Sequence, residues 1–161
     1  MKALVFSDSH GHMDNIRKVM GKEKNVDMVI HLGDILNQTS EFLGMCEGMP
    51  VIVRGNCDFF SDAPNATIFN LGPKRVFATH GHLYGVKYSY DRLYYAAYEQ
   101  KCDIALFGHT HEAMLSKDEK VTLFNPGSIS MPRRYSEKPT YGIIEVDETT
   151  GECEYYIESV E

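Results

Sequence analysis

The sequence predicts one α/β domain in which two β-sheets pack together and helices cover their outer faces. In the first half of the chain, short apolar runs alternate with amphipathic segments, a pattern typical of βαβ units and a mostly parallel sheet. In the second half, pairs of apolar runs flank short turns and predict β-hairpins. No linker, internal repeat or low-complexity tract interrupts the chain, so a single domain covering residues 1–161 is expected.

The first half is predicted to contain three strands and two helices. Each strand is a short run that is apolar almost throughout, as in strands buried on both faces. Ile16, Val19 and Met20 recur at helical spacing, and Thr39 or Ser40 is expected to cap a second, shorter helix. The expected strands are 3–7, 28–32 and 51–54, and the expected helices are 14–24 and 40–45.

The second half is predicted to be richer in hairpins. Gly72-Pro73-Lys74 separates two apolar runs, and charged or Gly-containing turns separate two further pairs. The expected strands are 67–71 with 75–79, 104–107, 113–116 with 121–124, and 141–146 with 153–157, and one helix is expected over 88–101.

Composition and charge exclude several classes of partner. A formal net charge of −7 argues against an extended nucleic-acid surface and against binding to an anionic membrane, because both need a basic stripe. No run approaches the roughly 18 apolar residues of a membrane span. The chain shows no secretory signal, and its four cysteines form no C-x-x-C pair, so reduced thiols and a cytoplasmic location are expected.

Side chains that can bind metals follow five of the predicted strands. Because ligands of parallel sheets bind at the carboxyl ends of the strands, these side chains are expected to meet at one edge. A lone Asp or His at a strand end is more often a cap or a surface residue, but seven together predict a metal site. The candidate metal ligands are Asp8, His10, Asp34, Asn56, His80, His109 and His111.

Seven ligands are more than one four-coordinate ion needs, which predicts two divalent metal ions. Asp34 has two oxygens and can bridge them. Mixed imidazole, carboxylate and amide ligands favour Mn²⁺, our first expectation, or Ni²⁺, Fe²⁺ or Zn²⁺ over Ca²⁺ and Mg²⁺. Two such ions about 3.5–4 Å apart can hold a hydroxide and a phosphoryl group together, so the expected partner is a small phosphorylated substrate.

The order of these motifs resembles that of the calcineurin-like metallophosphoesterases, and the resemblance covers essentially the whole chain. It implies a four-layer αββα sandwich with two mixed β-sheets flanked by helices. Asn125-Pro126-Gly127-Ser128 resembles the small bacterial and archaeal branch typified by the YfcE phosphodiesterases. The five ordered blocks are Asp8-Ser9-His10, Gly33-Asp34, Gly55-Asn56-Cys57-Asp58, His80-Gly81-His82 and Gly108–His111.

The resemblance also implies a role for each ligand. It implies that a hydroxide bridging the two metals attacks a phosphodiester, with Asn56 close to a phosphate oxygen and Asp58 in a supporting catalytic role. The ligands implied for one metal are Asp8, His10, Asp34 and His111, and those for the other are Asp34, Asn56, His80 and His109.

One position departs from the pattern of many family members. Cys57 stands where they have a histidine that contacts phosphate or protonates the leaving group, although the YfcE-like branch also shows Cys. A thiol with a reference pKa near 8.5 is a poor replacement for imidazole. The departure favours leaving groups that need little protonation, or an acid from elsewhere, such as His12 or His82.

Two other functions are open alternatives. A phosphomonoesterase would use the same centre. A non-catalytic, protein-binding scaffold of the same fold is known in the retromer, but in that lineage the bridging Asp and the Asn of the third block are altered. Asp34 and Asn56 are both present here, which favours an enzyme.

Other polar and aromatic side chains have structural interpretations. His31 lies within an apolar run and is expected to be a buried, hydrogen-bonded neighbour of the site. Arg133 and Arg134 are expected in a solvated loop, with a substrate phosphate as the alternative partner. Six tyrosines near one helix predict packing, with some rings at the interface of a homo-oligomer, or alternatively an aromatic wall beside the metals: Tyr84, Tyr88, Tyr90, Tyr94, Tyr95 and Tyr98.

Overall fold

The computed structural model describes residues 1–161 and contains two five-stranded sheets, three α-helices and two short 3₁₀ helices. The strands are β1 (Lys2–Phe6), β2 (Met28–His31), β3 (Met49–Ile52), β4 (Ala66–Leu71), β5 (Lys74–Thr79), β6 (Ile104–Leu106), β7 (Ala113–Ser116), β8 (Thr122–Pro126), β9 (Thr140–Val146) and β10 (Cys153–Ser159). The helices are α1 (Asp14–Lys22), η1 (Leu36–Gln38), α2 (Thr39–Met45), η2 (His82–Tyr84) and α3 (Asp91–Glu99).

Each sheet combines parallel and antiparallel strands. The first sheet has the order β10-β9-β1-β2-β3, in which β1, β2 and β3 are parallel and the β9–β10 hairpin joins antiparallel to β1. The second has the order β4-β5-β6-β8-β7, with β5, β6 and β8 parallel and an antiparallel strand at each edge. All ten strands were expected from the sequence, and each strand begins and ends within two residues of its expected position.

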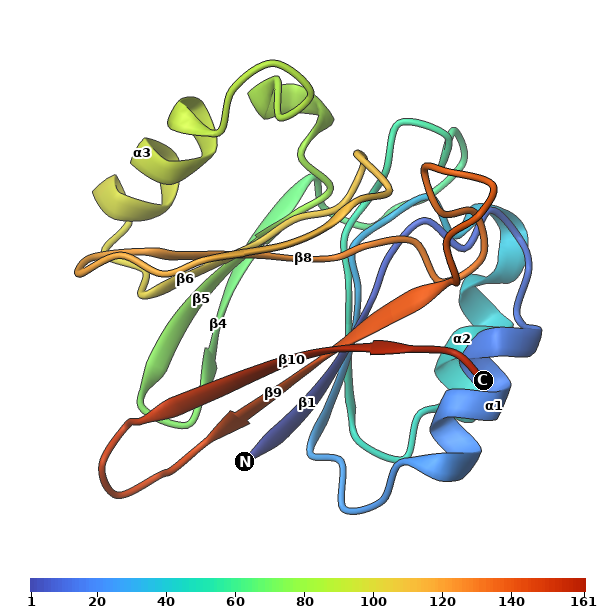
Figure 1. Cartoon of the computed structure of the whole chain (residues 1–161), viewed down its shortest axis with the longest axis horizontal. Coiled ribbons are helices and arrows are strands. Elements are labelled where there is room, and N and C mark those ends of the chain that lie inside the picture. The colour runs from blue at the N-terminus through green and yellow to red at the C-terminus, as the bar shows by residue number, and fades with distance from the viewer.

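The strands and helices form the four layers that the sequence resemblance implied. In Figure 1, α3 lies on one side of the strands, and α1 and α2 lie on the other. Successive side chains of a strand point to opposite faces, so β1, β2 and β9 of the first sheet each contribute to two cores. Ala3 and Val5 of β1 pack between the sheets, whereas Leu4 and Phe6 pack beneath α1 and α2. A third core lies beneath α3.

The third helix is shorter than predicted. The sequence indicated a helix over 88–101, but α3 spans Asp91–Glu99. At its start, Tyr88 donates its N–H to the carbonyl of Gly85 in a separate turn. At its end, Lys101 adopts a left-handed backbone with φ 56°, which stops the helix. The expected cap of α2 was also wrong, because Gln38 holds the capping position and no side chain caps the helix.

The helices of this fold are short. The longest, α1 and α3, have nine residues each. None of them has the length and apolar character needed to cross a bilayer.

A polar contact ties α1 to both of the neighbouring strands β1 and β9. Glu23, directly after α1, accepts hydrogen bonds from Lys2 Nζ at 2.8 Å and from Tyr141 Oη at 2.9 Å. Partial burial alone would raise the pKa of Glu23, but these two donors hold it below its usual value. The side chains of Lys2 and Glu23 are only 21% and 12% exposed, so solvent screens the pair weakly.

We expect Glu23→Gln to lower the free energy of unfolding at pH 7 by about 1–2 kcal/mol, since a neutral amide accepts weaker bonds. Because the folded-state pKa of Glu23 is lowered, its contribution is present above the unfolded pKa and is lost as pH falls through the folded value. Urea unfolding at pH 7 and pH 3 measures this. A gap between wild type and variant that does not shrink at pH 3 would contradict the assignment.

Candidate metal centre

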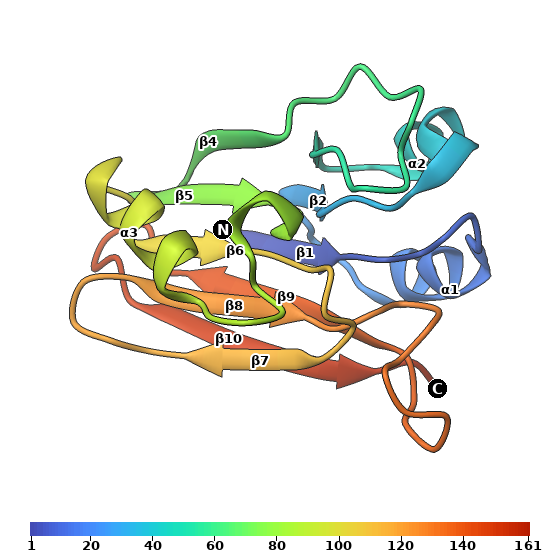
Figure 2. The same cartoon turned by 90° about the horizontal axis from the view of Figure 1, so that it is seen from above.

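The parallel strands of the two sheets end at the same side of the molecule, and candidate ligands follow five of them, β1, β2, β3, β5 and β6. In Figure 2, β1, β5 and β6 point in one direction, although β1 belongs to a different sheet from the other two. The loops after these strands are joined by backbone hydrogen bonds, such as Asp8 N–H to Gly33 O at 3.1 Å and Gly108 N–H to His80 O at 3.0 Å. The predicted ligands all lie on these loops: Asp8, His10, Asp34, Asn56, His80, His109 and His111.

Most of the predicted ligands have a left-handed backbone. Eight residues other than glycine have a positive φ in the chain, and five of them are candidate ligands. This conformation costs on the order of 1–3 kcal/mol per residue and persists only where the surrounding structure enforces it. The strain is therefore concentrated where side chains must be aimed at one point. The five are Asp8, His10, Asp34, His109 and His111.

Asp8 lies at the centre of the site and is fully buried. Its Oδ2 accepts hydrogen bonds from Ser7 Oγ at 2.6 Å and from the N–H of His109 at 3.0 Å. Its Oδ1 is buried without a hydrogen-bond donor and lies 3.2 Å from His111 Nε2 and 3.8 Å from His80 Nε2. An unpaired buried carboxylate oxygen surrounded by imidazole nitrogens is the arrangement that a bound cation would satisfy.

Hydrogen bonds fix which nitrogen of each central imidazole faces the site. His80 Nδ1 lies 2.7 Å from the carbonyl of Leu32, and His111 Nδ1 lies 2.5 Å from that of Met131. Because a carbonyl only accepts, each Nδ1 carries the proton, and each neutral ring then presents the lone pair of Nε2. Such contacts are those that orient metal-binding histidines.

Asp34 lies between two groups of ligands. Its Oδ2 is 3.4 Å from His80 Nε2 and 3.7 Å from His10 Nε2, while its Oδ1 accepts the N–H of Cys57 at 2.8 Å. Three sets of ligand atoms each lie within 4.8 Å of one another, and two of them contain Asp34. These sets are Asp8-His10-His111, Asp8-Asp34-His80 and His10-Asp34-Cys57.

Asn56 and His109 extend the site beyond His80. The side-chain oxygen of Asn56 lies 3.0 Å from His80 Nε2, and Asn56 is itself exposed. The rings of His80 and His109 have centroids 5.1 Å apart. The structure therefore gathers all seven predicted ligands in one region, although His109 belongs to none of the three sets.

The charges of the site favour a cation. Burial alone would raise the pKa of Asp8, but the adjacent rings of His111 and His80 bring it below its usual value. Burial likewise opposes ionisation of Asp34, yet His80 holds the pKa of Asp34 far below its usual range. Burial and the neighbouring His80 lower the pKa of His109 to about 4, which leaves its ring neutral. The carboxylates in turn raise the pKa of His80 and His111, and a divalent ion would take the place of the protons that these two rings share with Asp8 and Asp34.

Asp58, which the sequence indicated as a supporting residue, positions two of these loops. It is buried, and its Oδ2 accepts the N–H groups of Asp34 and Gly55, both at 2.8 Å. Its Oδ1 accepts the N–H of Leu36 at 2.7 Å. The carboxylate thus holds the loops after β2 and β3 side by side.

Several supporting residues were missed by the sequence interpretation. Ser7 was assigned only to a buried strand, yet its hydroxyl bonds Asp8. Ser128 Oγ donates to the carbonyl of Asp8 at 2.8 Å, and Asn125 Nδ2 donates to the carbonyl of Gly108 at 3.1 Å. The turn that resembled the YfcE-like branch therefore braces the first and last ligand loops, although its sequence alone indicated no such contact.

The other histidines have distinct surroundings. His31 is fully buried, with Nε2 3.0 Å from Ser9 Oγ and Nδ1 accepting the N–H of Gly33, so both nitrogens are used. Burial lowers the pKa of His31 to about 4. This agrees with the predicted structural role. His12 is exposed, whereas His82 packs near the His80 ring and keeps a buried, unpartnered Nδ1.

Three of the six tyrosines pack as predicted, the other three (Tyr88, Tyr95 and Tyr98) are exposed, and the arginines are exposed as expected. Tyr84, Tyr90 and Tyr94 pack against the core beneath α3, and Tyr94 Oη also contacts Asp118 in the β7–β8 hairpin, at the amino end of β8. The ligand loops lie at the opposite, carboxyl ends of the strands, so Tyr94 lies away from them. Arg134 is exposed and pairs with Glu137 at 3.8 Å.

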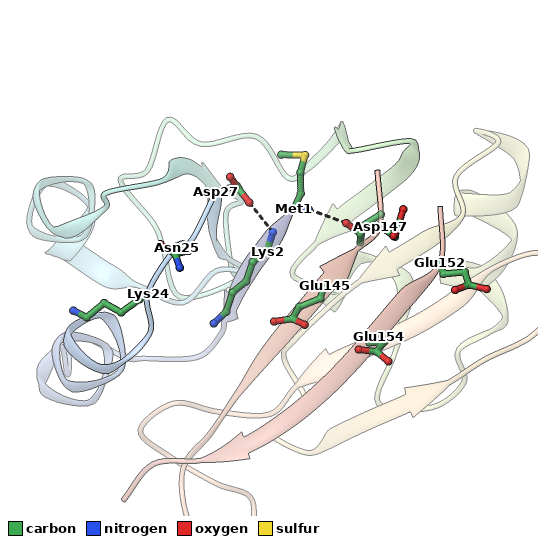
Figure 3. A pocket seen from close by; sticks show the side chains of 10 residues that line it. Met1, Lys2, Lys24, Asn25, Asp27, Glu145, Asp147, Glu152 and Glu154 are labelled. Atoms are coloured by element: carbon green, nitrogen blue, oxygen red, sulfur yellow. Dashed lines mark hydrogen bonds between the residues drawn. The ribbon is translucent and has the colours of Figure 1, made fainter. Parts of the chain in front are cut away.

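A wide, open depression of about 660 Å³ lies away from the centre (Figure 3). It is formed at the amino end of β1 by Met1 and Lys2, with the acidic side chains of Glu145, Asp147 and Glu154 facing it from β9, β10 and the turn between them. It contains none of the candidate ligands, so its size does not mark the chemical site.

A family model for the calcineurin-like phosphoesterase superfamily domain matches residues 1–149. The chain belongs to this superfamily. Among curated proteins, the probable metallophosphoesterase YsnB of Bacillus subtilis is 33% identical over 158 residues, which cover 97% of this chain and 90% of that protein. The phosphodiesterase YfcE of Escherichia coli is 28% identical and covers 91% of this chain and 89% of that protein. The branch inferred from the sequence is thereby confirmed.

Solved structures show the same fold. A predicted phosphoesterase from Streptococcus pneumoniae aligns with a TM-score of 0.80 at 30% identity, covering 98% of this metallophosphoesterase and 97% of that chain. Vps29 of Entamoeba histolytica in complex with Zn²⁺ aligns with a TM-score of 0.76 at 17% identity, covering 100% of both chains, a likeness of fold alone.

Close packing at Gly108 gives a test of the centre. A β-carbon there would collide with Ser7 Oγ and lie 2.7 Å from Asp8 Oδ2. The backbone of Gly108 is held on both sides by hydrogen bonds and cannot withdraw. We expect Gly108→Ala to lower the free energy of unfolding by about 1–3 kcal/mol and to weaken metal binding.

The matched control is Gly44→Ala in α2. A β-carbon at Gly44 meets nothing within 4 Å, so this variant should be neutral or more stable by roughly 0.5 kcal/mol. Chemical unfolding and calorimetric metal titration measure both variants. Equal effects on metal binding would contradict the packing argument.

Proposed function

We propose that this chain is a phosphodiesterase that depends on two divalent metal ions and acts on a small phosphorylated substrate. The observation that carries the proposal is the buried, unpartnered Oδ1 of Asp8, faced by Nε2 of His111 and His80, with Asp34 beside it. The metallophosphoesterase family and relatives named as phosphodiesterases, YfcE and MJ0936 of Methanocaldococcus jannaschii, support this chemistry.

The proposal divides the ligands between two ions that share Asp34. Two of the ligand sets support this division. One joins Asp8 to His10 and His111, and the other joins Asp34 to His80, with Asp8 near both sets. Mixed nitrogen and oxygen donors favour Mn²⁺, with Ni²⁺, Fe²⁺ or Zn²⁺ as alternatives. The proposed sets are Asp8, His10, Asp34 and His111 for one ion, and Asp34, Asn56, His80 and His109 for the other.

When bound, the two ions would lower the pKa of a water held between them for attack on phosphorus and neutralise charge on the phosphoryl oxygens. The protein's own part is orientation. Asp58 holds Asp34 and the loop of Asn56 in place through buried backbone hydrogen bonds. Asn56 is exposed at the mouth of the site, where its amide N–H groups can donate to a phosphoryl oxygen.

The contribution of Cys57 to the site comes from its backbone N–H and not from its thiol. Its N–H bonds Asp34 Oδ1, and this bond is independent of the side chain. Burial and the nearby carboxylate of Asp34 raise the pKa of the thiol to about 11, so the thiol stays protonated at neutral pH. A neutral thiol is neither a strong ligand nor a strong nucleophile.

Hydrolysis of bis(4-nitrophenyl) phosphate with added Mn²⁺ or Ni²⁺ tests the proposal. We expect wild type to bind about two ions per chain by elemental analysis. Asp34→Asn should lose activity by more than about a hundredfold, because it removes the shared carboxylate. Cys57→Ser keeps the backbone donor and should retain most of the activity.

A second substrate separates the alternatives. Faster turnover of 4-nitrophenyl phosphate, a monoester with the same leaving group, would favour a phosphomonoesterase. Absence of turnover of both esters with every divalent ion, together with tightly bound protein partners, would favour a scaffold. Fewer than about one ion per chain at saturation would contradict the two-metal centre.

A further inference from the structure

A second feature lies directly beside the metal centre. A cleft of about 450 Å³ opens between η1 with the start of α2 and the loop that follows β3. We call it the aromatic cleft and define it by Leu36, Cys57, Phe59 and Phe60, which line it together with polar side chains. It continues from the centre, because Cys57 Sγ lies within 4.8 Å of ligand atoms of both His10 and Asp34.

Two consecutive aromatic rings are presented to solvent at this cleft. Phe59 is 74% exposed and Phe60 is 93% exposed, and neither belongs to any of the three cores. Packing of the fold therefore does not account for them. Adjacent exposed aromatic side chains beside a candidate active site are typical of a surface that binds an apolar group.

The rings stand on an ordered turn. Ser61 donates its N–H to the carbonyl of Asp58 at 3.2 Å, and Arg54 Nη2 donates to the carbonyl of Phe59 at 3.2 Å. Hydrogen bonds to Arg54, just after β3, and to Asp58 thus hold the turn in place. A surface that is already ordered loses less conformational entropy on binding.

Leu36, which also lines the aromatic cleft, has a strained backbone. Leu36 has a left-handed φ of 60°, which is uncommon for a bulky residue. Its N–H is held by Asp58 Oδ1 at 2.7 Å, and its side chain lies against Gly11, next to His10. Strain of this kind persists where the structure enforces it, and here it belongs to an apolar residue that lines the cleft together with the two rings.

The lining carries little charge that would attract an ionic group. Asp58 is the one charged residue that lines the cleft, and both of its oxygens are occupied by backbone N–H groups. The depression in Figure 3 is by contrast lined by several charged side chains. A flat, uncharged and apolar group fits the aromatic cleft best.

We propose that the aromatic cleft binds an aromatic group esterified to the substrate phosphate, so that the natural substrate is an aryl-bearing phosphate ester. The inference rests on the proposed function, because the phosphoryl group must sit at the metal centre for its ester group to reach Cys57 and the rings beyond it. Stacking on Phe59 and Phe60 would then supply selectivity for aromatic over alkyl esters.

Binding of two non-hydrolysable anions to the Mn²⁺-loaded protein tests this. Phenylphosphonate and methylphosphonate share the charged group and differ in the ring. By titration calorimetry, we expect wild type to bind phenylphosphonate about tenfold more tightly. Phe59→Ala/Phe60→Ala should reduce that preference to less than about threefold and leave methylphosphonate binding unchanged.

The control is Tyr95→Ala, which removes a 59%-exposed ring from α3, far from the cleft, and should keep the tenfold preference. Equal affinity of wild type for the two phosphonates, or an unchanged preference in the double variant, would overturn the cleft proposal and leave the proposed function standing. Failure of both phosphonates to bind the metal-loaded protein would overturn both proposals.

Discussion

The carboxylate of Asp58 is the contact on which both the metal centre and the aromatic cleft depend. It accepts the N–H groups of Asp34, Leu36 and Gly55, which lie on two different loops. These donors lie beyond the ends of β2 and β3, where no sheet partner remains for them. Hydrogen bonds to a charged acceptor are about twice as strong as neutral ones. One side chain therefore positions the backbone of Asp34 and one wall of the cleft.

The centre combines two arrangements that are unfavourable on their own. Asp8 and Asp34 are buried carboxylates, and burial of an ionised group without compensation is costly. Five of the candidate ligands also hold a left-handed backbone, which persists only where the surrounding structure enforces it. Both costs fall at the same place because the two sheets bring their parallel strands to one end. A rigid scaffold beneath strained loops is a general way to fix ligands in space.

The sequence predicted the strands and the chemical type of the site, because both follow from local patterns. Apolar runs identify buried strands, and the polar residue after each run marks a carboxyl end. The limits of α3 were not predictable in this way, because it is ended by the backbone of Lys101 and preceded by a turn at Gly85, and side-chain periodicity indicates neither. The hydrogen bonds of Ser7 and Asn125 depend on which loops meet, which only the packing of the two sheets determines.

At Cys57, the sequence reveals the unusual side chain but not the hydrogen bond that the backbone makes. From the sequence, the thiol is the unusual feature of the site, since many family members have a histidine there. In the structure, the N–H of Cys57 bonds Asp34 and the side chain lines the passage toward Phe59 and Phe60. Any residue except proline supplies the same N–H at this position. The side chain can therefore change without moving Asp34. Its size and chemistry instead determine the surface that joins the candidate metal centre to the aromatic cleft.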